Sequence, residues 1–473
     1  MKKKFYITSP AYYVNDVPHI GHTYSTVAVD ILARWHRLIG DETFFLTGTD
    51  EHGAKIEEKA NAMGLKPQKY TDEIADKFKQ AWKKLNISND NFSRTTDVNH
   101  MKAVQKALQF MYDNGDIYLS KYEGLYCRGC EQYKAEKDLI DGVCPDHKTT
   151  PEKMSEECYT FRLSKYQNKL LNLIKKDELQ ILPLHKKNEI VSFYEKEGLN
   201  DVSFSRKNVS WGIPIPWDKS HTTYVWADAF LYYLTGLGWD GDVKNVPELF
   251  PPTAQLMSKD ILRVHTTIWP AMLLSLGLPL PKTLFIHGYF LIDGQKMSKS
   301  LGNVIVPEEL IKKYGVDATR YLIISATVFG NDGDISWQQF DKKYNADLAN
   351  GLGNLVSRIS NLLEKNDLKL DLKINSEEEL IRKFKEKMLA FEFDEALKLL
   401  WKKLKYGDEI LSNERPWKMD DKEKIKQVLQ PIAQDILNVA VLLESFMPDV
   451  SKKLIEQFSA NQIKKGESLF PRI

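Results

Sequence analysis

The 473-residue sequence has no long apolar run and no recognisable leader. Its longest apolar stretch, residues 268–280, is interrupted by two prolines and a glycine and is too short to span a bilayer. The N-terminus passes from three lysines to Ser9-Pro10 and leaves no room for the apolar core of a signal peptide. We therefore expect a cytoplasmic protein that uses no membrane.

An excess of one charge is also absent, because 66 Lys and Arg stand against 65 Asp and Glu and the net charge is +1. A nucleic acid would have to be held by a local basic surface rather than by a global field. Charge neither demands nor excludes an RNA partner. With 42% hydrophobic and 28% charged residues, the composition is that of a soluble globular protein of two to four domains.

Cysteine is scarce, and three of the four cysteines fall within 18 positions. The pattern is Cys127-x2-Cys130, then 13 residues, then Cys144-x2-His147. In a reducing compartment this cluster indicates a metal site rather than disulfides. Three thiolates and an imidazole fill a tetrahedral Zn²⁺ site and leave no position for water, so we expect one structural zinc. The alternative is a set of unliganded thiols, and Cys158 lies outside the pattern as a packed or spare thiol.

The start of the chain has the pattern of a strand–helix–strand unit. Residues 5–8 and 43–47 are apolar and β-branched, and apolar residues recur at helical spacing from 24 to 38. A helix that connects two strands in this way implies a parallel sheet and an α/β fold. Ligands of such sheets bind at the carboxyl ends of the strands, which places residues 9–22 and 48–53 at the binding edge.

The middle of the chain is predicted to complete the sheet domain around an insertion. From 118 to about 201, short segments and turns surround the cysteine cluster. Strands are expected again at 254–257 and 284–287, and they flank one helix that carries Ile261, His265 and Trp269.

The C-terminal part is predicted to be a separate helical domain. Beyond about residue 339 the strand patterns cease, and long amphipathic runs lie near 346–364, 376–405 and 421–446. The segments predicted from these patterns are 1–117 and 202–291 for the two halves of the sheet domain, 118–201 for the insertion, 292–340 for a segment that begins with a mobile loop, and 341–473 for the helical bundle.

The first chemical motif is His19-Ile20-Gly21-His22, placed where the connecting helix begins. A helix start presents unpaired N–H groups and the positive end of the helix dipole, and it therefore attracts phosphate. His19 and His22 lie on one face of the first turn and can bind phosphate oxygens, while Gly21 lets a nucleotide approach the backbone. The alternative is a pair of ordinary histidines at a helix start.

The second motif is Lys-Met-Ser-Lys-Ser at 296–300, bracketed by Gly294 and Gly302. It predicts a mobile loop that carries two ammonium groups and two hydroxyls. Lysines are flexible point charges suited to a triphosphate whose charge redistributes during reaction. A solvated basic loop is the alternative.

Together, in this order, the two motifs resemble the paired signatures of the class I aminoacyl-tRNA synthetases. The resemblance implies a Rossmann-like catalytic domain that binds ATP with Mg²⁺, forms an aminoacyl-adenylate and transfers the amino acid to tRNA. No side-chain nucleophile is needed, because the substrate carboxylate attacks. The residues implied for ATP are His19, Gly21, His22, Lys296, Ser298 and Lys299, of which His19, His22, Lys296 and Lys299 are implied to be catalytic.

Three aromatic strings, at 10–15, 224–229 and 261–270, resemble the methionyl-tRNA synthetases. A polarisable thioether gains from aromatic edges, and an unbranched side chain needs a deep pocket walled by rings. The alternative is an ordinary core stripe. The resemblance implies that Asp50 pairs with the substrate ammonium and that Arg206 lies near its carboxylate. The implied methionine-binding set is Ala11, Tyr13, Asp50, Arg206, Trp226, Ala229, Tyr233, Ile261, His265 and Trp269.

Two positions depart from the family pattern. Ala11 stands where a bulkier aliphatic residue is common, so one pocket wall could be shallower, and Ser258 stands where glycine is usual. Neither departure touches the reacting atoms.

The same resemblance implies that the insertion is a zinc knuckle, that 292–340 contacts the tRNA stem, and that the bundle reads the CAU anticodon. RNA loops are read by aromatic stacking and by hydrogen bonds to base edges. The implied anticodon residues are Asn354, Arg358, Pro416 and Trp417, and the alternative is a capping Asn and a buried Trp. The partners are then ATP, methionine and tRNA(Met), including initiator tRNA. Because the chain stops at 473, where the family core ends, we expect a monomer.

Two rival interpretations are weaker. A cysteinyl-tRNA synthetase needs a thiolate at the end of the first strand, where Ser9-Pro10-Ala11 stands here. A catalytically silent RNA-binding relative would not need to keep His19, His22, Lys296 and Lys299.

Overall fold

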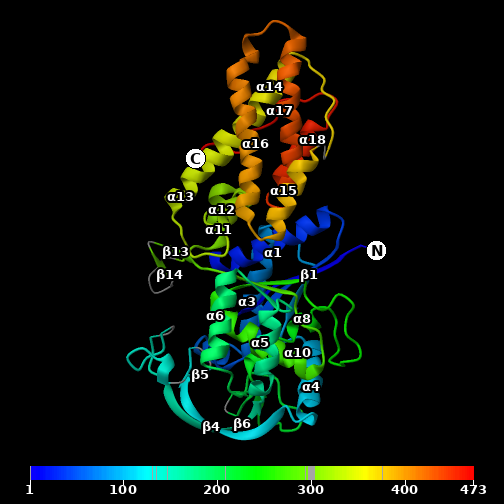
Figure 1. Ribbon diagram of the computed structural model, residues 1–473. Coiled ribbons are helices and arrows are strands. Elements are labelled where there is room, and N and C mark those ends of the chain that lie inside the picture. The colour runs from blue at the N-terminus through cyan, green and yellow to red at the C-terminus, as the bar shows by residue number, and fades with distance from the viewer. Residues whose placement is uncertain are drawn as a thin grey trace. The chain divides into compact units, whose positions relative to one another are not determined.

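The computed structural model describes residues 2–129, 132–134, 136–145, 148–207, 209–292, 294–296, 304–374 and 377–473. By their contacts the residues form two units, shown in Figure 1. The first unit consists of residues 1–18, 42–80 and 89–286, and the second of residues 19–41, 81–88 and 287–473. Among the described residues, no helix is both long enough and apolar enough to cross a membrane.

A six-stranded sheet forms the centre of the first unit, in the order β3-β2-β1-β11-β12-β7. The pairs β1–β2, β1–β11, β2–β3 and β12–β7 are parallel, which confirms the parallel α/β prediction. Nearly every residue of β1 from Phe5 onward is buried or half-buried, as expected for a parallel strand covered on both faces. The strands are β1 (Lys4–Tyr13), β2 (Glu42–Asp50), β3 (Asn91–Arg94), β7 (Gln180–Leu182), β11 (Ala254–Ser258) and β12 (Thr283–His287).

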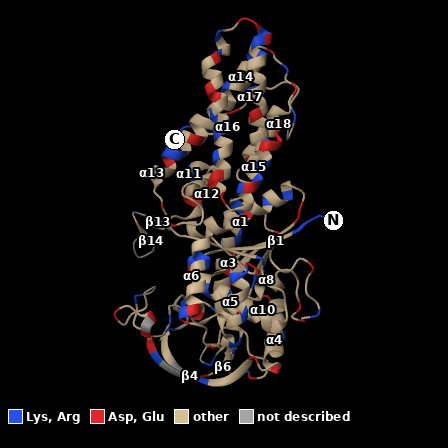
Figure 2. Cartoon of the chain, in the orientation of Figure 1, with Lys and Arg blue, Asp and Glu red and all other residues tan. Residues whose placement is uncertain are grey.

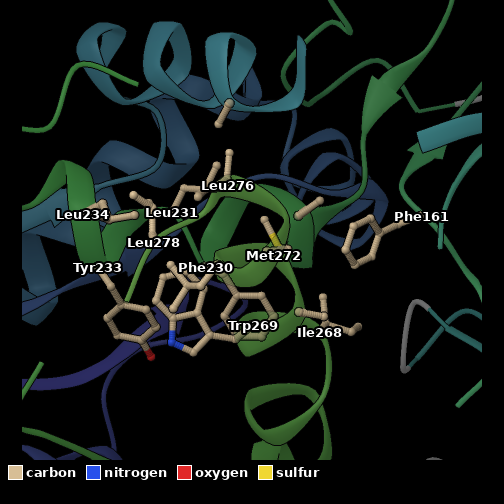
Figure 3. Packing of buried hydrophobic residues seen from close by; sticks show 14 of the residues in the cluster. Phe161, Phe230, Leu231, Tyr233, Leu234, Ile268, Trp269, Met272, Leu276 and Leu278 are labelled. Atoms are coloured by element: carbon tan, nitrogen blue, oxygen red, sulfur yellow. The ribbon is translucent and has the colours of Figure 1, made fainter. Parts of the chain in front are cut away.

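An aromatic and aliphatic core packs within this unit. Figure 3 shows Phe230, Tyr233 and Trp269 beside Met272 and Leu276, all of them buried. The helices of the region are α2 (Ala54–Ala62), α3 (Pro67–Lys84), α4 (Val98–Asp113), α5 (Gln167–Lys175), α6 (Leu184–Lys196), α7 (Val225–Ala229), α8 (Tyr232–Thr235), α9 (Leu262–Thr266) and α10 (Ile268–Leu276).

The region predicted as an insertion of short segments differs from that expectation in two ways. Two long antiparallel strands, β4 (Ile117–Cys127) and β6 (Glu152–Phe161), form the centre of a sheet ordered β5-β4-β6-β8. In addition, β7 pairs with β12 at the edge of the central sheet, so the region contributes a strand to the sheet domain. A three-residue strand is too short to give a periodic signal. The minor strands are β5 (Gln132–Lys134), β8 (Val202–Ser203), β9 (Ser205–Arg206) and β10 (Thr222–Thr223).

The single helix predicted through Ile261, His265 and Trp269 is wrong in detail, because the chain forms a 3-10 turn (Lys259–Ile261) and then α9 and α10, which meet at Thr267. Pro270 supplies the reason. It has no N–H to donate to the carbonyl of Thr266, four residues earlier. The hydroxyl of Tyr194 donates to that carbonyl instead, at 2.7 Å.

The second unit contains the connecting helix α1 (Ile20–Leu38) and the helices that follow residue 304. Figure 2 shows both signs of charge along α15, α16 and α17, in keeping with the balanced net charge. A small sheet orders β14 (Gln295–Lys296), β13 (Phe290–Ile292) and β15 (Gly333–Asp334). The helices are α11 (Pro307–Tyr314), α12 (Val316–Ser325), α13 (Trp337–Lys343), a π-helix (Tyr344–Gly353), α14 (Asn354–Lys365), α15 (Glu378–Leu389), α16 (Phe393–Glu414), a 3-10 turn (Pro416–Lys418), α17 (Lys422–Leu443) and α18 (Pro448–Phe458).

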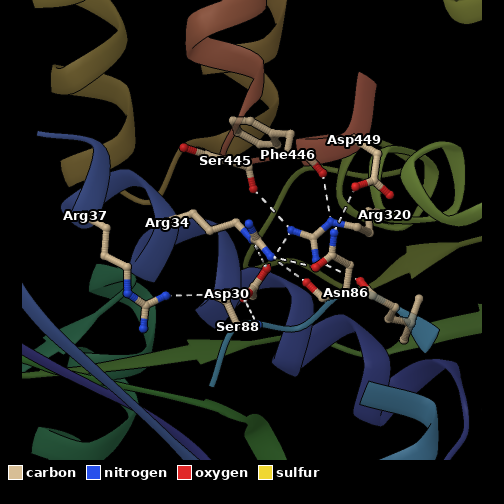
Figure 4. A network of polar contacts seen from close by, with 10 residues as sticks. Asp30, Arg34, Arg37, Asn86, Ser88, Arg320, Ser445, Phe446 and Asp449 are labelled. Atoms are coloured by element: carbon tan, nitrogen blue, oxygen red, sulfur yellow. Dashed lines mark hydrogen bonds and ion pairs between the residues drawn. The ribbon is translucent and has the colours of Figure 1, made fainter. Parts of the chain in front are cut away.

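A buried polar network joins α1 to these helices (Figure 4). Asp30 of α1 binds Arg320 of α12 at 2.7 Å, and neither side chain is exposed. Arg320 also donates to the backbone carbonyls of Ser445 and Phe446, and Asp30 accepts from the backbone and hydroxyl of Ser88. The helix that begins with the histidine motif is therefore fixed against the helical part of its own unit.

Candidate active site

His19 and His22 cap the N-terminus of α1 reciprocally. The Nδ1 of His19 accepts the backbone N–H of Gly21 at 3.1 Å, and the Nδ1 of His22 accepts the backbone N–H of His19 at 3.2 Å. The two rings stack with their centroids 3.9 Å apart. A Cβ on residue 21 would lie 2.9 Å from the ring of His19, so glycine allows this ring to fold over the helix start.

This capping fixes the tautomer of both histidines. An Nδ1 that accepts an N–H carries no proton itself, so each neutral ring carries its proton on Nε2. The pKa of His22 lies well below its usual range because burial and the neighbouring His19 disfavour the charged form. The motif therefore places two neutral imidazoles, each with its proton on Nε2, beside the positive end of a helix dipole, which is an arrangement suited to phosphate oxygens.

The second ATP motif is only partly described. Lys296 ends β14, whose partner in the ladder is β13, and Gly294 donates its backbone N–H to Asp334 at 3.2 Å. Ser298, Lys299 and the side chain of Lys296 lie outside the described residues. Their part in ATP binding stays a prediction.

A hydrogen-bonded chain links three residues of the predicted methionine set. The Nδ1 of His265 lies 2.9 Å from the carbonyl oxygen of Ile261 and must donate to it. Its Nε2 therefore accepts the hydroxyl of Tyr233 at 2.8 Å. Burial lowers the pKa of His265 to about 4, so this imidazole is neutral at physiological pH.

Aromatic rings surround His265. Phe230 meets it edge-on with ring centroids 4.9 Å apart, and the centroid of Trp226 lies 6.4 Å away. Trp269 stacks on Phe230 at 5.7 Å, and Figure 3 shows these two rings side by side. The indole N–H of Trp269 donates to Gln255 of β11 at 3.0 Å. Trp269 is fully buried in the core, whereas Trp226 is only partly buried.

Tyr13 and Asp50 face each other in the β1–β2 register, and Ala11 faces Gly48 in the same ladder. All three therefore lie at the carboxyl end of the sheet, as predicted. Asp50 is buried, and Ala11 packs partly against the core.

Arg206 lies on β9 rather than in the central sheet. Its guanidinium donates to the hydroxyl of Ser203 at 2.9 Å and lies 4.4 Å over the ring of Tyr224, the residue that precedes α7. Ala229 is buried at the end of α7. Arg206 thus stays close to the helix that carries Trp226 and Ala229, and its predicted role towards the carboxylate stays a prediction.

The sequence interpretation assigned no role to a buried cluster beside these residues. Asp228 of α7 accepts the Nδ1–H of His52 at 2.6 Å and the Nε2–H of His100 at 2.7 Å. All three side chains are almost fully buried. The sequence contained one signal for this cluster, which was the charged residue Asp228 within the apolar string 224–229. A buried carboxylate needs hydrogen-bond donors, so its position there predicts donor partners.

The model of the family described as "tRNA synthetases class I (M)" matches residues 5–152 and 135–360 of the chain. The chain belongs to this family. The resemblance inferred from the two motifs is thereby confirmed, and the chain is an aminoacyl-tRNA ligase that uses ATP.

Relatives and solved structures agree with this assignment. The methionine–tRNA ligase of Caldanaerobacter subterraneus subsp. tengcongensis is 42% identical over 100% of this chain and 79% of that protein. That of Streptomyces coelicolor is 40% identical over 97% of this chain and 90% of that protein. Mycobacterium tuberculosis methionyl-tRNA synthetase in complex with methionyl-adenylate has a TM-score of 0.93 at 33% identity and covers 100% of both chains.

The predicted zinc ligands of this class I synthetase are only half described. Cys127 at the end of β4 and Cys144 are both fully buried. The backbone N–H of Cys144 donates to Thr149, and its carbonyl accepts from Lys148, which makes a tight turn around the thiol. Cys130 and His147 lie outside the described residues. Among those described, no group of three potential ligands forms a metal site.

In the synthetase's helical part, two of the predicted anticodon residues lie together. The guanidinium of Arg358 on α14 lies 5.4 Å over the ring of Trp417 and pairs with Asp408 of α16. Trp417 is 47% exposed, so it is not the buried core residue of the alternative interpretation. Pro416 is buried beside it, and Asn354 is exposed one turn before Arg358. The π-helix passes without a break into α14 at Asn354, so Asn354 lies inside a continuous helical run and does not cap that run.

Proposed function

We propose that this class I synthetase attaches methionine to tRNA(Met) in two steps at the residues described above. The observation that carries the proposal is the reciprocal capping of His19 and His22, which uses the Nδ1 atom of each ring and places the Nε2–H group of each ring at the start of α1. A helix start with two neutral hydrogen-bond donors is better suited to binding a triphosphate than to packing in a hydrophobic core.

In the first step, an oxygen of the methionine carboxylate attacks the α-phosphorus of ATP. The bond from that phosphorus to the bridging oxygen breaks, and pyrophosphate leaves with the electron pair. His19 and His22 donate to phosphate oxygens, and Lys296 and Lys299 balance the charge of the departing pyrophosphate. Mg²⁺, when bound with ATP, supplies further charge neutralisation. In the second step a 3′-terminal ribose hydroxyl of the tRNA attacks the carbonyl carbon, and AMP leaves.

The methionine side chain is held by ring edges and by the neutral His265. A thioether sulfur gains little from a charged neighbour and more from aromatic edges. Burial keeps the imidazole neutral, and the Tyr233–His265–Ile261 chain holds it in place, which suits an apolar ligand. Asp50 pairs with the substrate ammonium and Arg206 with its carboxylate.

A structural zinc ion is held by Cys127, Cys130, Cys144 and His147. Two observations support the fit: the Cys127 and Cys144 thiols are fully buried, and Cys144 sits in a tight turn whose backbone is satisfied locally. Such a closed set of soft ligands supplies folding energy and leaves no position for a substrate.

The helical part recognises the anticodon of tRNA(Met), including initiator tRNA. An exposed indole beside a guanidinium offers a base both a stacking face and hydrogen-bond donors. Asn354 adds an amide on the same helix as Arg358. The enzyme acts in the cytoplasm.

Amino-acid-dependent ATP–pyrophosphate exchange, measured with each standard amino acid, tests the proposal. Methionine should dominate the exchange, and charging should follow with tRNA carrying a CAU anticodon. Exchange that is absent, or that responds equally to leucine and methionine, would overturn the assignment.

A further inference from the structure

Asp228 receives two imidazole N–H groups from two different elements. His52 follows β2 by two residues, His100 lies in α4, and Asp228 lies in α7. The carboxylate is 1% exposed, and the imidazoles of His52 and His100 are 4% and 1% exposed. Three segments that are distant in sequence therefore meet at one carboxylate.

The cluster extends to a fourth residue, Thr235. The remaining nitrogen of His100, Nδ1, lies 2.7 Å from the hydroxyl of Thr235 in α8. Two N–H groups bind the carboxylate, and the Thr235 hydroxyl binds His100. The pKa of Asp228 lies below its usual range: burial works against this, but the neighbouring His52 and His100 outweigh it. The cluster is thus one buried negative charge fixed by two donors.

Two of the three members, Asp228 and His52, lie close in sequence to residues of the predicted methionine set. Asp228 stands between Trp226 and Ala229 on α7, and His52 is two residues beyond Asp50. Glu51, the residue between Asp50 and His52, is fully buried and binds Arg94 of β3 through both carboxylate oxygens at 2.7 and 2.8 Å. The two residues after Asp50 therefore hold its loop from two sides, one towards β3 and one towards α7.

We propose that Asp228 is a positioning residue for methionine, and that it sets the distance between the Asp50 loop and the Trp226–Ala229 turn by binding His52 and His100. The inference rests on the proposed function, because the proposed function assigns these two segments to the methionine pocket. Asp228 does not touch the substrate. It holds one segment that carries the ammonium partner and one that carries the ring lining the side chain.

Side-chain replacements that keep or remove one donor test the inference. Asn places an N–H where His carries Nδ1, and Gln places one where His carries Nε2. His52→Asn and His100→Gln should therefore keep the bond to Asp228, while His52→Leu and His100→Leu remove it. Asp228→Asn keeps the shape but replaces one acceptor oxygen by a donor.

Pyrophosphate exchange is measured for each variant of the whole chain, with methionine and ATP varied separately. Asp228→Asn, His52→Leu and His100→Leu should raise the KM for methionine about 10- to 100-fold, the range set by one lost charge-assisted hydrogen bond. The KM for ATP should change less than about threefold, and the donor-keeping variants should remain within about threefold of the parent for both substrates.

A matched control is the buried pair His36–Asp41 of the second unit, with an Nδ1–oxygen distance of 2.6 Å. Asp41→Asn makes the same chemical change and should leave the KM for methionine unchanged. Melting temperatures of all variants are recorded with the kinetics.

Three results would overturn the inference: an unchanged KM for methionine in Asp228→Asn, an equal rise in the KM for both substrates, or the same losses in the donor-keeping and donor-lacking variants at a lowered melting temperature. The last pattern would mean a purely structural cluster. A parent protein without methionine-dependent exchange would instead overturn the proposed function.

Discussion

Arg320 and Asp30 form an ion pair at 2.7 Å in which neither side chain is exposed to solvent. Arg320 also donates to the carbonyls of Leu85, Ser445 and Phe446, so one guanidinium satisfies acceptors from three segments (Figure 4). Burial opposes the charge on Asp30, yet Arg320 and Arg34 keep its pKa below the usual range. Because α1 begins with the two histidines, this pair fixes the helix whose first turn is proposed to bind phosphate.

Arg320→Met should lower the free energy of unfolding by about 3 to 5 kcal/mol, because it removes one of the two guanidinium groups that bind a buried carboxylate and leaves three carbonyls without their donor. Urea unfolding of variant and parent measures the loss. The exposed pair Arg382–Glu379 is the control, and Arg382→Met should leave the unfolding curve nearly unchanged. A parent-like midpoint for Arg320→Met would contradict the network's role.

The two nitrogens of His19 can be tested separately. His19→Asn keeps an acceptor at the Nδ1 position and hence the helix cap, but it removes the Nε2–H donor. Pyrophosphate exchange should fall about 100- to 1,000-fold with little change in melting temperature. His19→Gln, which keeps the distal donor and weakens the cap, should lose stability but retain more activity. The reverse ranking would mean that His19 serves the helix alone.

Zinc analysis of protein purified without chelators should return one ion per chain. Cys144→Ser should lose the ion, because it removes one of the four proposed ligands. Cys158→Ser should keep it, since Cys158 is buried against Ser120 and Thr160 on β4 and β6. Equal zinc content in both variants, or none in the parent, would refute the ligand set.

Trp417→Ala should separate the two half-reactions. Base stacking on an aromatic ring is worth about 1 to 3 kcal/mol, so kcat/KM for tRNA should fall roughly fivefold to 150-fold while pyrophosphate exchange stays at the parent rate. Trp417→Phe should restore most of the loss. Tyr406→Ala removes another exposed ring of the same part and serves as the control. Equal losses in exchange and charging would contradict anticodon stacking.

The depressed pKa of His265 predicts a slope of stability with pH. The imidazole titrates at about 4 in the folded chain against an ordinary value of 6.5. Between these values the unfolded chain holds a proton that the folded chain does not, so the free energy of unfolding falls as the pH drops through this window. The contribution of one such group approaches about 1.4 kcal/mol per pH unit.

His265→Leu should remove that part of the slope, whatever its effect on absolute stability. Urea unfolding at several pH values between 6.5 and 4 measures both slopes. The pKa of His22 is lowered in the same sense, so the comparison between variant and parent isolates His265. Identical slopes would mean that His265 is not the buried neutral imidazole described above.

The sequence by itself determined the class of fold and of chemistry. Strands at 5–8, 43–47, 254–257 and 284–287 follow from local apolar runs, and each appears in the sheet. The phosphate motif at 19–22 could be placed at a helix start, because the residues before it have the apolar pattern of a strand and the residues after it have helical spacing. These signals are local in sequence, and local signals survive without knowledge of the fold. The zinc ligands and the domain boundaries stay predictions of the same kind.

The tertiary structure alone decided the partners and protonation states of the buried groups. Asp228 binds His52 and His100, which lie 176 and 128 residues away in the sequence. Arg320 binds Asp30, which is also distant in the sequence. The neutral form of His265 depends on burial, and the carbonyl of Thr266, which Pro270 leaves without its helical donor, is satisfied by the hydroxyl of Tyr194. A carboxylate or imidazole takes its charge state from the groups around it, and only the folded chain brings those groups together.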